Sequence, residues 1–201
     1  MKLFHTISGN FAVNTYYLVV GNDAIVIDGG VDGEEVLSYA RTNGFTVKYM
    51  LLTHTHFDHA TSAKYLQDNG VKIVVSALEA DGLQDDDLNA SNYFGLKFEH
   101  LTPDITFNDG EVLDLLGLKI KCIITPGHSK GSSCFIVDNL LFSGDTLFNE
   151  GVGRFDLKGG SGRALLTSLK RLLALDFNYT VYPGHGEATS IEHEKIYNPY
   201  V

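Results

Sequence analysis

The sequence lacks any apolar run long enough to cross a membrane. A spanning helix needs about 18 or more consecutive apolar residues, and polar side chains interrupt every hydrophobic run of this chain well before that length. The first five residues, 1–5, also lack the apolar stretch and small-residue cleavage site of a secretory signal peptide. We therefore expect a cytoplasmic protein that has no membrane partner.

Positive charge is scarce as well. The chain has 15 Lys and Arg residues against 25 Asp and Glu residues, which gives a formal net charge of −10 at pH 7. Proteins that bind nucleic acids usually present a basic surface, because contacts with phosphate dominate their affinity. The composition therefore disfavours a DNA or RNA partner. Three consecutive acids at residues 85–87 are interpreted as a solvated loop, because no calcium-binding loop with a closing glutamate follows them.

Cysteine is limited to Cys122 and Cys134, each inside an apolar run. Their number and spacing exclude a CxxC redox motif and a zinc finger, so we expect two buried free thiols. The chain also lacks a Gly-x-Ser-x-Gly nucleophile motif, and neither cysteine has a histidine near it in sequence. The sequence therefore gives no support for catalysis through a covalent intermediate.

What the chain does contain is an alternation of β-like and helical segments, which predicts one α/β domain over residues 1–201. The stretch at residues 77–92 is polar and is expected to be part helix and part loop. The expected strands are residues 16–20, 24–28, 48–52, 72–75, 118–124, 133–137, 140–143 and 179–182. The expected helices are residues 33–44, 59–70 and 162–175.

Five histidines and two aspartates stand in polar clusters, each of which follows an expected strand. Strand ends deliver side chains to one rim of a sheet, so clusters far apart in sequence can converge there. Imidazole and carboxylate groups are ligands that suit zinc, iron or manganese. The residues are His54, His56, Asp58, His59, His128, Asp145 and His185. The other histidines, at positions 5, 100 and 193, are expected to be ordinary surface or core residues.

The first cluster has an informative spacing. If its loop is extended, His54, His56 and Asp58 share one side of the backbone. His59 then begins the next helix and points elsewhere, so that one segment can serve two adjacent metals.

The spacing His54-x-His56-x-Asp58-His59 resembles the signature of the metallo-β-lactamase superfamily. Further matches follow in the expected order, and an upstream strand ending in Asp28 resembles the family's first motif, in which the aspartate supports the metal loop. The matching motifs are residues 25–30, 125–128, 143–146 and 183–186. The resemblance covers nearly the whole chain. It implies a four-layer αββα sandwich with the metals at one edge.

The same resemblance implies two metal ions. Zinc is expected, with iron or manganese as alternatives in one or both sites. Asp145 would bridge the two metals alongside a hydroxide that attacks the substrate, and Asp58 is also assigned a catalytic role. The implied ligands of the first metal are His54, His56 and His128, and those of the second are Asp58, His59 and His185.

A bridging aspartate resembles the glyoxalase-II-like branch, and residues 147–155 and 194–200 look like the corresponding segments of its short bacterial relatives. The implied partner is a small-molecule thioester such as S-lactoylglutathione, or a related small ester, with Phe148 and Arg154 as substrate contacts. A thiolate leaves without a strong general acid, because the pKa of a thiol is about 8.5.

The chain departs from that branch at three points. Only 16 residues follow His185, so we do not expect the helical C-terminal domain that helps to bind glutathione in that branch. The expected glutathione-binding tyrosines are replaced, since Asp156 follows Phe155 and Glu187 lies two residues after His185. Hydrolysis of a thioester or ester is therefore expected, whereas glutathione specificity is left open.

Other functions remain open. A persulfide dioxygenase has a similar fold and uses one iron, held by residues equivalent to His54, His128 and Asp145, so that metal content would separate it from a hydrolase. A lactonase is a further alternative, whereas Asp145 argues against a β-lactamase and the acidic charge and short length argue against a nuclease. A catalytically silent binding domain is disfavoured, because inactive relatives normally lose ligands and all seven are present here.

Overall fold

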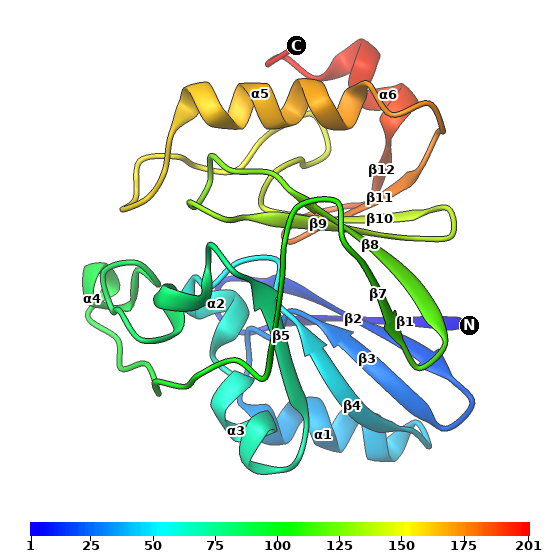
Figure 1. Ribbon diagram of the computed structural model, residues 1–201, viewed down its shortest axis with the longest axis vertical. Coiled ribbons are helices and arrows are strands. Elements are labelled where there is room, and N and C mark those ends of the chain that lie inside the picture. Colours follow the sequence, from blue (N-terminus) through cyan, green and yellow to red (C-terminus); the bar gives the residue numbers. More distant parts are fainter.

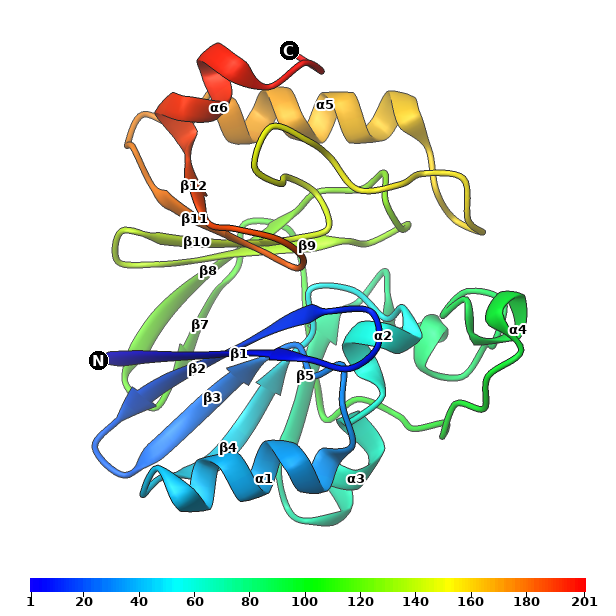
Figure 2. The same cartoon turned by 180° about the vertical axis from the view of Figure 1, so that it is seen from behind.

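A computed structural model describes residues 1–201 of the chain, except for the side chain of residue 8. Two β-sheets lie face to face, and helices cover the outer face of each sheet (Figures 1 and 2). The order of layers is therefore α, β, β, α, which confirms the expected fold. Within the described residues, no helix combines the length and apolarity required to span a bilayer.

The first sheet contains the N-terminal half of the chain. The pairs β1–β2 and β2–β3 are antiparallel, and the pairs from β3 to β6 are parallel. In spatial order the strands are β1 (Lys2–Ser8), β2 (Val13–Val20), β3 (Asp23–Ile27), β4 (Thr46–Leu51), β5 (Lys72–Ser76) and β6 (Ile105–Phe107). The helices against its outer face are α1 (Gly33–Thr42) and α3 (Ala63–Asp68).

The second sheet contains the C-terminal half. It is antiparallel apart from the parallel pair β10 and β11. In spatial order the strands are β12 (Thr189–Ser190), β11 (Thr180–Pro183), β10 (Leu140–Gly144), β9 (Ser133–Val137), β8 (Leu118–Ile124) and β7 (Val112–Leu115). The helices on its outer face are α5 (Gly162–Leu173) and α6 (Ile191–Tyr197).

Both faces of each central strand are buried, as strand β2 illustrates. Tyr16 and Leu18 face the apolar layer between the two sheets, whereas Tyr17 and Val19 face the layer under α1 and α3. This alternation follows from the two-residue period of a strand, and burial on both faces explains why these strands are almost continuously apolar in sequence.

The expected helix at residues 59–70 is confirmed only in part, because two short helices form in place of one continuous helix: α2 (Phe57–Ala60) and α3 (Ala63–Asp68). The break has a local cause. The backbone N–H of Ser62 donates to the carbonyl oxygen of Gly29, at 3.3 Å, instead of to the preceding helical turn. Tying this segment to the end of β3 therefore interrupts the helical hydrogen-bond ladder.

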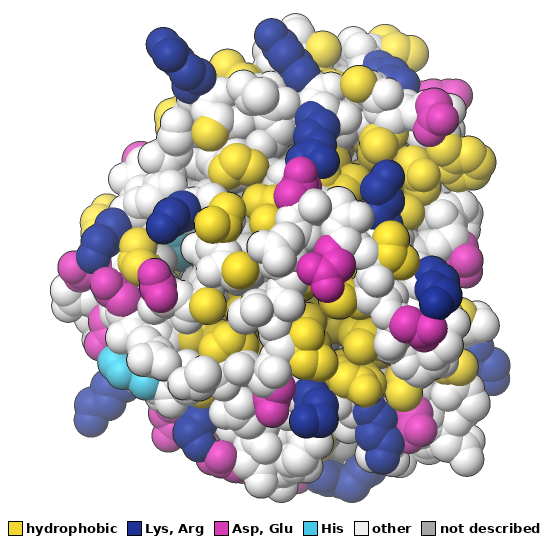
Figure 3. Space-filling view, viewed as in Figure 1, with side chains coloured by type: hydrophobic (Ala, Val, Ile, Leu, Met, Phe, Trp, Pro, Cys, Tyr) yellow, Lys and Arg dark blue, Asp and Glu magenta, His cyan; other side chains and the backbone are white. Residues whose placement is uncertain are grey.

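The polar stretch at residues 77–92 contains a short 3-10 helix, η1 (Ala80–Leu83), and leads into α4 (Ser91–Phe94), as the mixed helix and loop prediction proposed. The three acids at residues 85–87 lie in the loop between these two helices, and each of them is at least partly exposed. Cys122 and Cys134 are free and buried, which confirms the prediction for both thiols. On the face drawn in Figure 3, Lys and Arg side chains are spread over several elements among acidic ones.

Candidate metal centre

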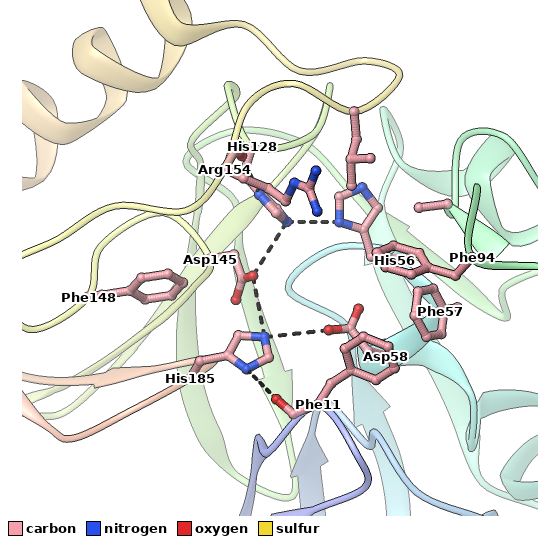
Figure 4. Close-up of a pocket in the computed structure, with 12 residues that line it drawn as sticks. Phe11, His56, Phe57, Asp58, Phe94, His128, Asp145, Phe148, Arg154 and His185 are labelled. Atoms are coloured by element: carbon pink, nitrogen blue, oxygen red, sulfur yellow. Dashed lines mark hydrogen bonds and ion pairs between the residues drawn. The ribbon is translucent and has the colours of Figure 1, made fainter. Parts of the chain in front are cut away.

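All seven residues singled out from the sequence lie at one edge of the sandwich. They follow the carboxyl ends of β4 in the first sheet and of β8, β10 and β11 in the second, which run in the same direction. Strand ends from both sheets therefore supply the site, as the sequence predicted. Figure 4 shows how five of these side chains point toward one another across the gap.

The first group of candidate ligands is a triad of buried histidines. The ring nitrogens of His54, His56 and His128 lie within 4.8 Å of one another. The Nε2 atom of His128 is 2.8 Å from Nδ1 of His56 and 3.1 Å from Nε2 of His54. Three imidazole nitrogens directed at one point form a donor set that suits a divalent metal.

The second group combines a carboxylate with two histidines. The Nε2 atoms of His59 and His185 are 3.3 Å apart. The Oδ2 atom of Asp58 lies 3.8 Å from the first of these nitrogens and 3.5 Å from the second. Asp58 lies in the helical turn α2 with His59, so the prediction that it shares one side of an extended loop with His54 and His56 is wrong.

Asp145 lies between the two groups. Its Oδ1 atom is 3.4 Å from Nε2 of His59, and its Oδ2 atom is 3.5 Å from Nε2 of both His128 and His185. The side chain is buried, yet its Oδ1 has no hydrogen-bond partner among the described residues, and neither has Nε2 of buried His56. An unpaired buried carboxylate oxygen surrounded by imidazoles fits a metal ligand, because leaving such an atom unpaired is otherwise costly.

The histidines of the first group are held neutral. Burial lowers the pKa of His56 to about 3, with the neighbouring His128 as the next cause. Burial likewise lowers the pKa of His128 to about 4, and it lowers the pKa of His54 well below its ordinary value. A neutral imidazole is the form that binds a metal, so this triad is ready to accept one at neutral pH.

The histidines of the second group have the opposite tendency. Burial opposes a charge on His59, but the carboxylates of Asp145, Asp58 and Asp28 outweigh it and raise the pKa of His59 to about 10. For His185, burial is likewise outweighed by the hydrogen bond that its ring donates to Asp58 and by the charge of Asp145, which raise its pKa. A metal that binds this group would therefore have to displace protons from the ring nitrogens of His59 and His185.

The ring orientation of three histidines is fixed by hydrogen bonds on the side away from the cluster. The Nδ1 atom of His59 contacts Oδ2 of Asp28 at 2.9 Å, and the Nδ1 atoms of His128 and His185 contact the backbone carbonyls of Arg154 and Phe11 at 2.6 and 3.0 Å. Because each Nδ1–H donates to an oxygen, the Nε2 lone pair is left to face the cluster.

Asp28 supports the metal loop, as the sequence motif implied. In addition to its contact with His59, its carboxylate accepts hydrogen bonds from the backbone N–H of Thr53 at 2.8 Å and from the Thr53 hydroxyl at 2.7 Å. Asp28 itself has a φ of 56°, which is unusual for a residue other than glycine. The backbone therefore accepts some strain at the point where the carboxylate must face the loop.

Glu79 is a supporting residue that the sequence did not reveal. Its buried carboxylate accepts hydrogen bonds from the backbone N–H and the hydroxyl of Thr55, at 3.0 and 2.8 Å. It also accepts hydrogen bonds from the Ser129 hydroxyl and the Gly131 N–H, at 2.7 and 2.6 Å. Thr55 lies between His54 and His56, and Ser129 follows His128, so Glu79 joins the two loops of the first group.

A pocket of about 320 Å³ opens beside the cluster (Figure 4). Both residues predicted to contact a substrate, Phe148 and Arg154, line it. Arg154 also forms a two-pronged ion pair with Asp156, with nitrogen–oxygen distances of 2.7 and 2.8 Å. The remaining lining residues outside the cluster are Phe11, Phe57, Ala90, Phe94 and Leu157.

The family model described as the metallo-beta-lactamase superfamily matches residues 8–185 of the chain. Among curated proteins, a probable metallo-hydrolase of Streptococcus pyogenes serotype M6 is 35% identical, and the match covers 100% of this chain and 90% of the relative. The hydroxyacylglutathione hydrolase GloC of Haemophilus influenzae is 34% identical, with 89% of this chain and 87% of the relative covered.

Solved structures of similar fold also match nearly the whole chain. The BLEG-1 B3 metallo-beta-lactamase superposes with a TM-score of 0.93 at 30% identity, and the match covers 99% of each chain. A di-iron-bound form of TTHA1623 superposes with a TM-score of 0.87 at 33% identity, covering 98% of this chain and 100% of the other.

Proposed function

The chain belongs to the metallo-beta-lactamase superfamily, and we propose that it is a binuclear metallohydrolase that cleaves a thioester, or a related small ester, by direct attack of water. The position of Asp145 carries this proposal. Its two oxygens face histidines of both candidate ligand groups, and one of these oxygens has no hydrogen-bond partner among the described residues. A carboxylate in that position is suited to bridge two metals.

In this proposal the first metal is held by His54, His56 and His128. The second is held by Asp58, His59 and His185, with Asp145 shared between them. A bound pair of divalent metals supplies Lewis acidity and lowers the pKa of water, and zinc, iron and manganese all suit these nitrogen and oxygen ligands.

The chain's own residues provide position and surroundings. Phenyl rings on two sides of the cluster limit access of bulk water and offer an apolar surface to the substrate. The Asp58 carboxylate is kept ionised: burial opposes its charge, but His59 and His185 outweigh burial and lower its pKa. As a member of the cluster that also lines the pocket, it can orient incoming water as a hydrogen-bond acceptor, which is the catalytic role we assign to it.

A thioester suits this site because the reaction places little demand on a general acid. The pKa of a thiol is about 8.5, so a thiolate can depart unprotonated at neutral pH. The cysteines of the chain are buried away from the pocket, which agrees with attack by water and not by a thiol of the protein. The relative named hydroxyacylglutathione hydrolase, at 34% identity, supports a thioester as the substrate class.

The experiment that tests this proposal joins metal analysis to hydrolysis on one sample. We expect about two divalent metals per chain, turnover of a thioester such as S-lactoylglutathione, loss of turnover on chelation and recovery when metal is returned. A sample that holds two metals and hydrolyses neither a thioester nor a related small ester contradicts the proposal. A single bound iron without hydrolysis would instead favour the persulfide dioxygenase, and the neighbour with two irons shows that this fold accepts iron.

The variant His56→Ala tests whether this cluster is the active site. Loss of one buried ligand should lower thioester turnover by at least about a hundredfold while the far-ultraviolet circular dichroism stays native. His193→Ala is the matched control, because this histidine lies on α6 and contacts Glu150 at the surface. Full turnover in His56→Ala would place the active site elsewhere.

β-Lactams form the second candidate substrate class. The reason is the structural neighbour named as a B3 metallo-beta-lactamase, at a TM-score of 0.93. The same metal-loaded sample should therefore be tested with a cephalosporin and with a lactone. A larger kcat/KM for either than for every thioester would replace the thioester as the substrate.

A further inference from the structure

Aromatic rings line the pocket on two sides of the cluster of candidate metal ligands (Figure 4). The ring of Phe57 packs edge-on against Phe11, with centroids 5.0 Å apart, and lies 5.1 Å from the ring of Phe94. Phe148 lies on the other side, next to His185. Phe11 and Phe94 remain 42% and 39% exposed, so a ligand in the pocket can cover apolar surface that is otherwise open to water.

Arg154 is the only Lys or Arg among the described lining residues, and its charge is already engaged. Its Nε and one terminal nitrogen both donate to the carboxylate of Asp156, and its guanidinium lies 5.8 Å from the centre of the Tyr93 ring. The hydrogen bonds from Arg154 lower the pKa of Asp156 to about 2, so this carboxylate is charged throughout the neutral range. The positive charge of Arg154 is thus paired with the negative charge of a carboxylate two residues later in the sequence.

Lys158, the next basic residue in the sequence, also pairs with acidic side chains. The Nζ atom of Lys158 lies 3.4 Å from Asp85 and 3.3 Å from Asp87, two acids of the loop between η1 and α4. The single positive charge of Lys158 therefore faces two negative charges and leaves a net negative charge in this group. This side of the pocket mouth has no surplus of positive charge for an anionic ligand.

Glutathione is an unfavourable ligand for such a pocket. Its thioesters carry two carboxylates and one ammonium group, and such carboxylates need cationic or N–H partners when they leave water. To pair with Arg154 they would have to compete with the Asp156 carboxylate, which already neutralises the guanidinium charge from two residues away. A thioester whose thiol portion is uncharged meets no such competition.

We propose that Asp156 is a specificity-determining residue that neutralises the charge of Arg154, and that the substrate is an uncharged thioester whose apolar or aromatic acyl group packs on Phe11, Phe57 and Phe94. This inference rests on the proposed thioester hydrolysis. It names the substrate class of the same site.

Four thioesters test it on the metal-loaded protein: lactoyl and phenylacetyl esters, each of glutathione and of the uncharged thiol N-acetylcysteamine. We expect kcat/KM to be at least about tenfold higher for each N-acetylcysteamine ester than for the glutathione ester of the same acyl group. For one thiol, the phenylacetyl ester should exceed the lactoyl ester, mainly through a lower KM. Calorimetric binding of the uncleaved thioethers S-benzyl-N-acetylcysteamine and S-benzylglutathione should give the same order of affinities.

Asp156→Asn separates the role of this carboxylate from the general acidity of the protein. It should raise kcat/KM for both glutathione esters about tenfold, through KM, and change that of the N-acetylcysteamine esters less than about twofold. Asp114→Asn is the matched control, because Asp114 also pairs with a surface cation, Lys119, on the hairpin β7–β8 and does not line the pocket. It removes the same charge and should leave all four values unchanged.

Phe94→Ala tests the aromatic wall. It should weaken the preference for phenylacetyl over lactoyl esters about tenfold, whereas Phe177→Ala, at an exposed phenylalanine that does not line the pocket, should not alter it. A wild-type preference for glutathione esters, or an unchanged preference in Asp156→Asn, overturns the inference and leaves thioester hydrolysis standing. Failure of the loaded protein to cleave any of the four overturns both.

Discussion

Glu79 shows that a residue outside the metal cluster can decide its geometry. Its carboxylate accepts four hydrogen bonds, two from Thr55 and one each from Ser129 and Gly131, and is only 5% exposed. Two of the donors are backbone N–H groups of the loops that carry the first group of histidines. If the carboxylate were removed, these buried donors would lose their partners.

Glu79→Ala should therefore lower metal affinity at the first group by about 10- to 100-fold, the range seen when a group that orients ligands is lost. It should also lower the free energy of unfolding of the metal-free protein by about 3 kcal/mol, because buried donors are left unpaired. Glu79→Gln tests whether the charge is needed, since an amide NH₂ replaces one acceptor oxygen. Metal titration and urea unfolding measure the two effects.

Glu99→Ala is the matched control, since Glu99 is exposed in the loop after α4. If Glu79→Ala binds metal as tightly as this control does, Glu79 only fills space in the fold.

The two ligand groups should differ in how metal affinity depends on pH. In the first, His56 and His128 have pKa values lowered to about 3 and 4, so no proton has to leave between pH 6 and 8. In the second, the pKa of His59 is raised to about 10 and that of His185 is also raised, so a metal must displace protons. Affinity at the second group should therefore rise about tenfold per pH unit for each proton released, whereas affinity at the first stays nearly constant.

Calorimetric zinc titrations at pH 6 and pH 8, each in two buffers of different ionisation enthalpy, measure both affinities and the protons released. At pH 6 the first equivalent should bind much more tightly than the second, and the gap should narrow at pH 8. Equal proton release by the two equivalents would contradict the assignment of raised pKa values to the second group.

At the scale of elements, helix α5 shows how well a periodic apolar pattern predicts the bounds and the buried face of a helix. The apolar stripe predicted a helix over residues 162–175, and the helix spans Gly162–Leu173. Its N-terminus is capped as its sequence indicates, since the Ser161 hydroxyl accepts from the N–H of Ala164. Leu165, Leu169 and Leu172 are buried against the second sheet, as their spacing requires.

Leu169→Ala should lower the free energy of unfolding by about 2–5 kcal/mol, because the side chain is 0% exposed and its removal leaves a cavity. Leu166→Ala on the same helix should cost about 0.5 kcal/mol or less, since Leu166 is 40% exposed. Urea unfolding monitored by circular dichroism compares them. Equal losses for the two variants would mean that α5 does not pack through the stripe that the sequence predicts.

Elements without a strong pattern could not be predicted. Strands β1, β6, β7 and β12 lie at or next to sheet edges, and β6, β7 and β12 have only two to four residues, so no clear alternation could build up. The break between α2 and α3 depends on a hydrogen bond from Ser62 to Gly29, a tertiary contact that no local pattern reports. Long, buried and periodic segments were predictable because one physical signal repeats along them.

In the candidate site, too, some residues could be predicted from the sequence and others could not. All seven cluster residues could be named because His and Asp at strand ends are rare and carry their chemistry in the side chain. Glu79 could not, because an acid in a polar stretch is normally solvated and its burial follows only from the packing of two distant loops. The pairing of Asp156 with Arg154 was equally hidden, since residues two apart can face together or apart depending on the loop.

For the whole molecule, the position of the cluster matters more than any single ligand. Four of the seven residues follow β4 of the first sheet, and the other three follow strands of the second. Asp145 from the second sheet contacts His59 from the first at 3.4 Å. Metals at this point would fasten the two sheets along one edge, where buried carboxylates and a charged imidazole otherwise face one another.

Removal of the metals should therefore lower stability and loosen one edge of the sandwich. A ligand present at about 1,000 times its Kd stabilises the folded state by about 4 kcal/mol, which for a chain of this size shifts Tm by about 10 °C. Chelation should lower Tm by roughly that amount, and returning the metal should restore it. His56→Ala, which already binds metal weakly, should respond less to the chelator.

Hydrogen exchange distinguishes local loosening from general unfolding. After chelation the amides of residues 53–60, 125–132 and 183–186 should exchange faster, because these loops carry ligands from both sheets. Amides of α1 and α5, on the outer faces, should change only as far as global stability falls. If protection is lost uniformly, or if Tm is unchanged although metal analysis shows that the ions have gone, then apolar packing between the sheets alone holds this edge together and the cluster serves chemistry without supporting the fold.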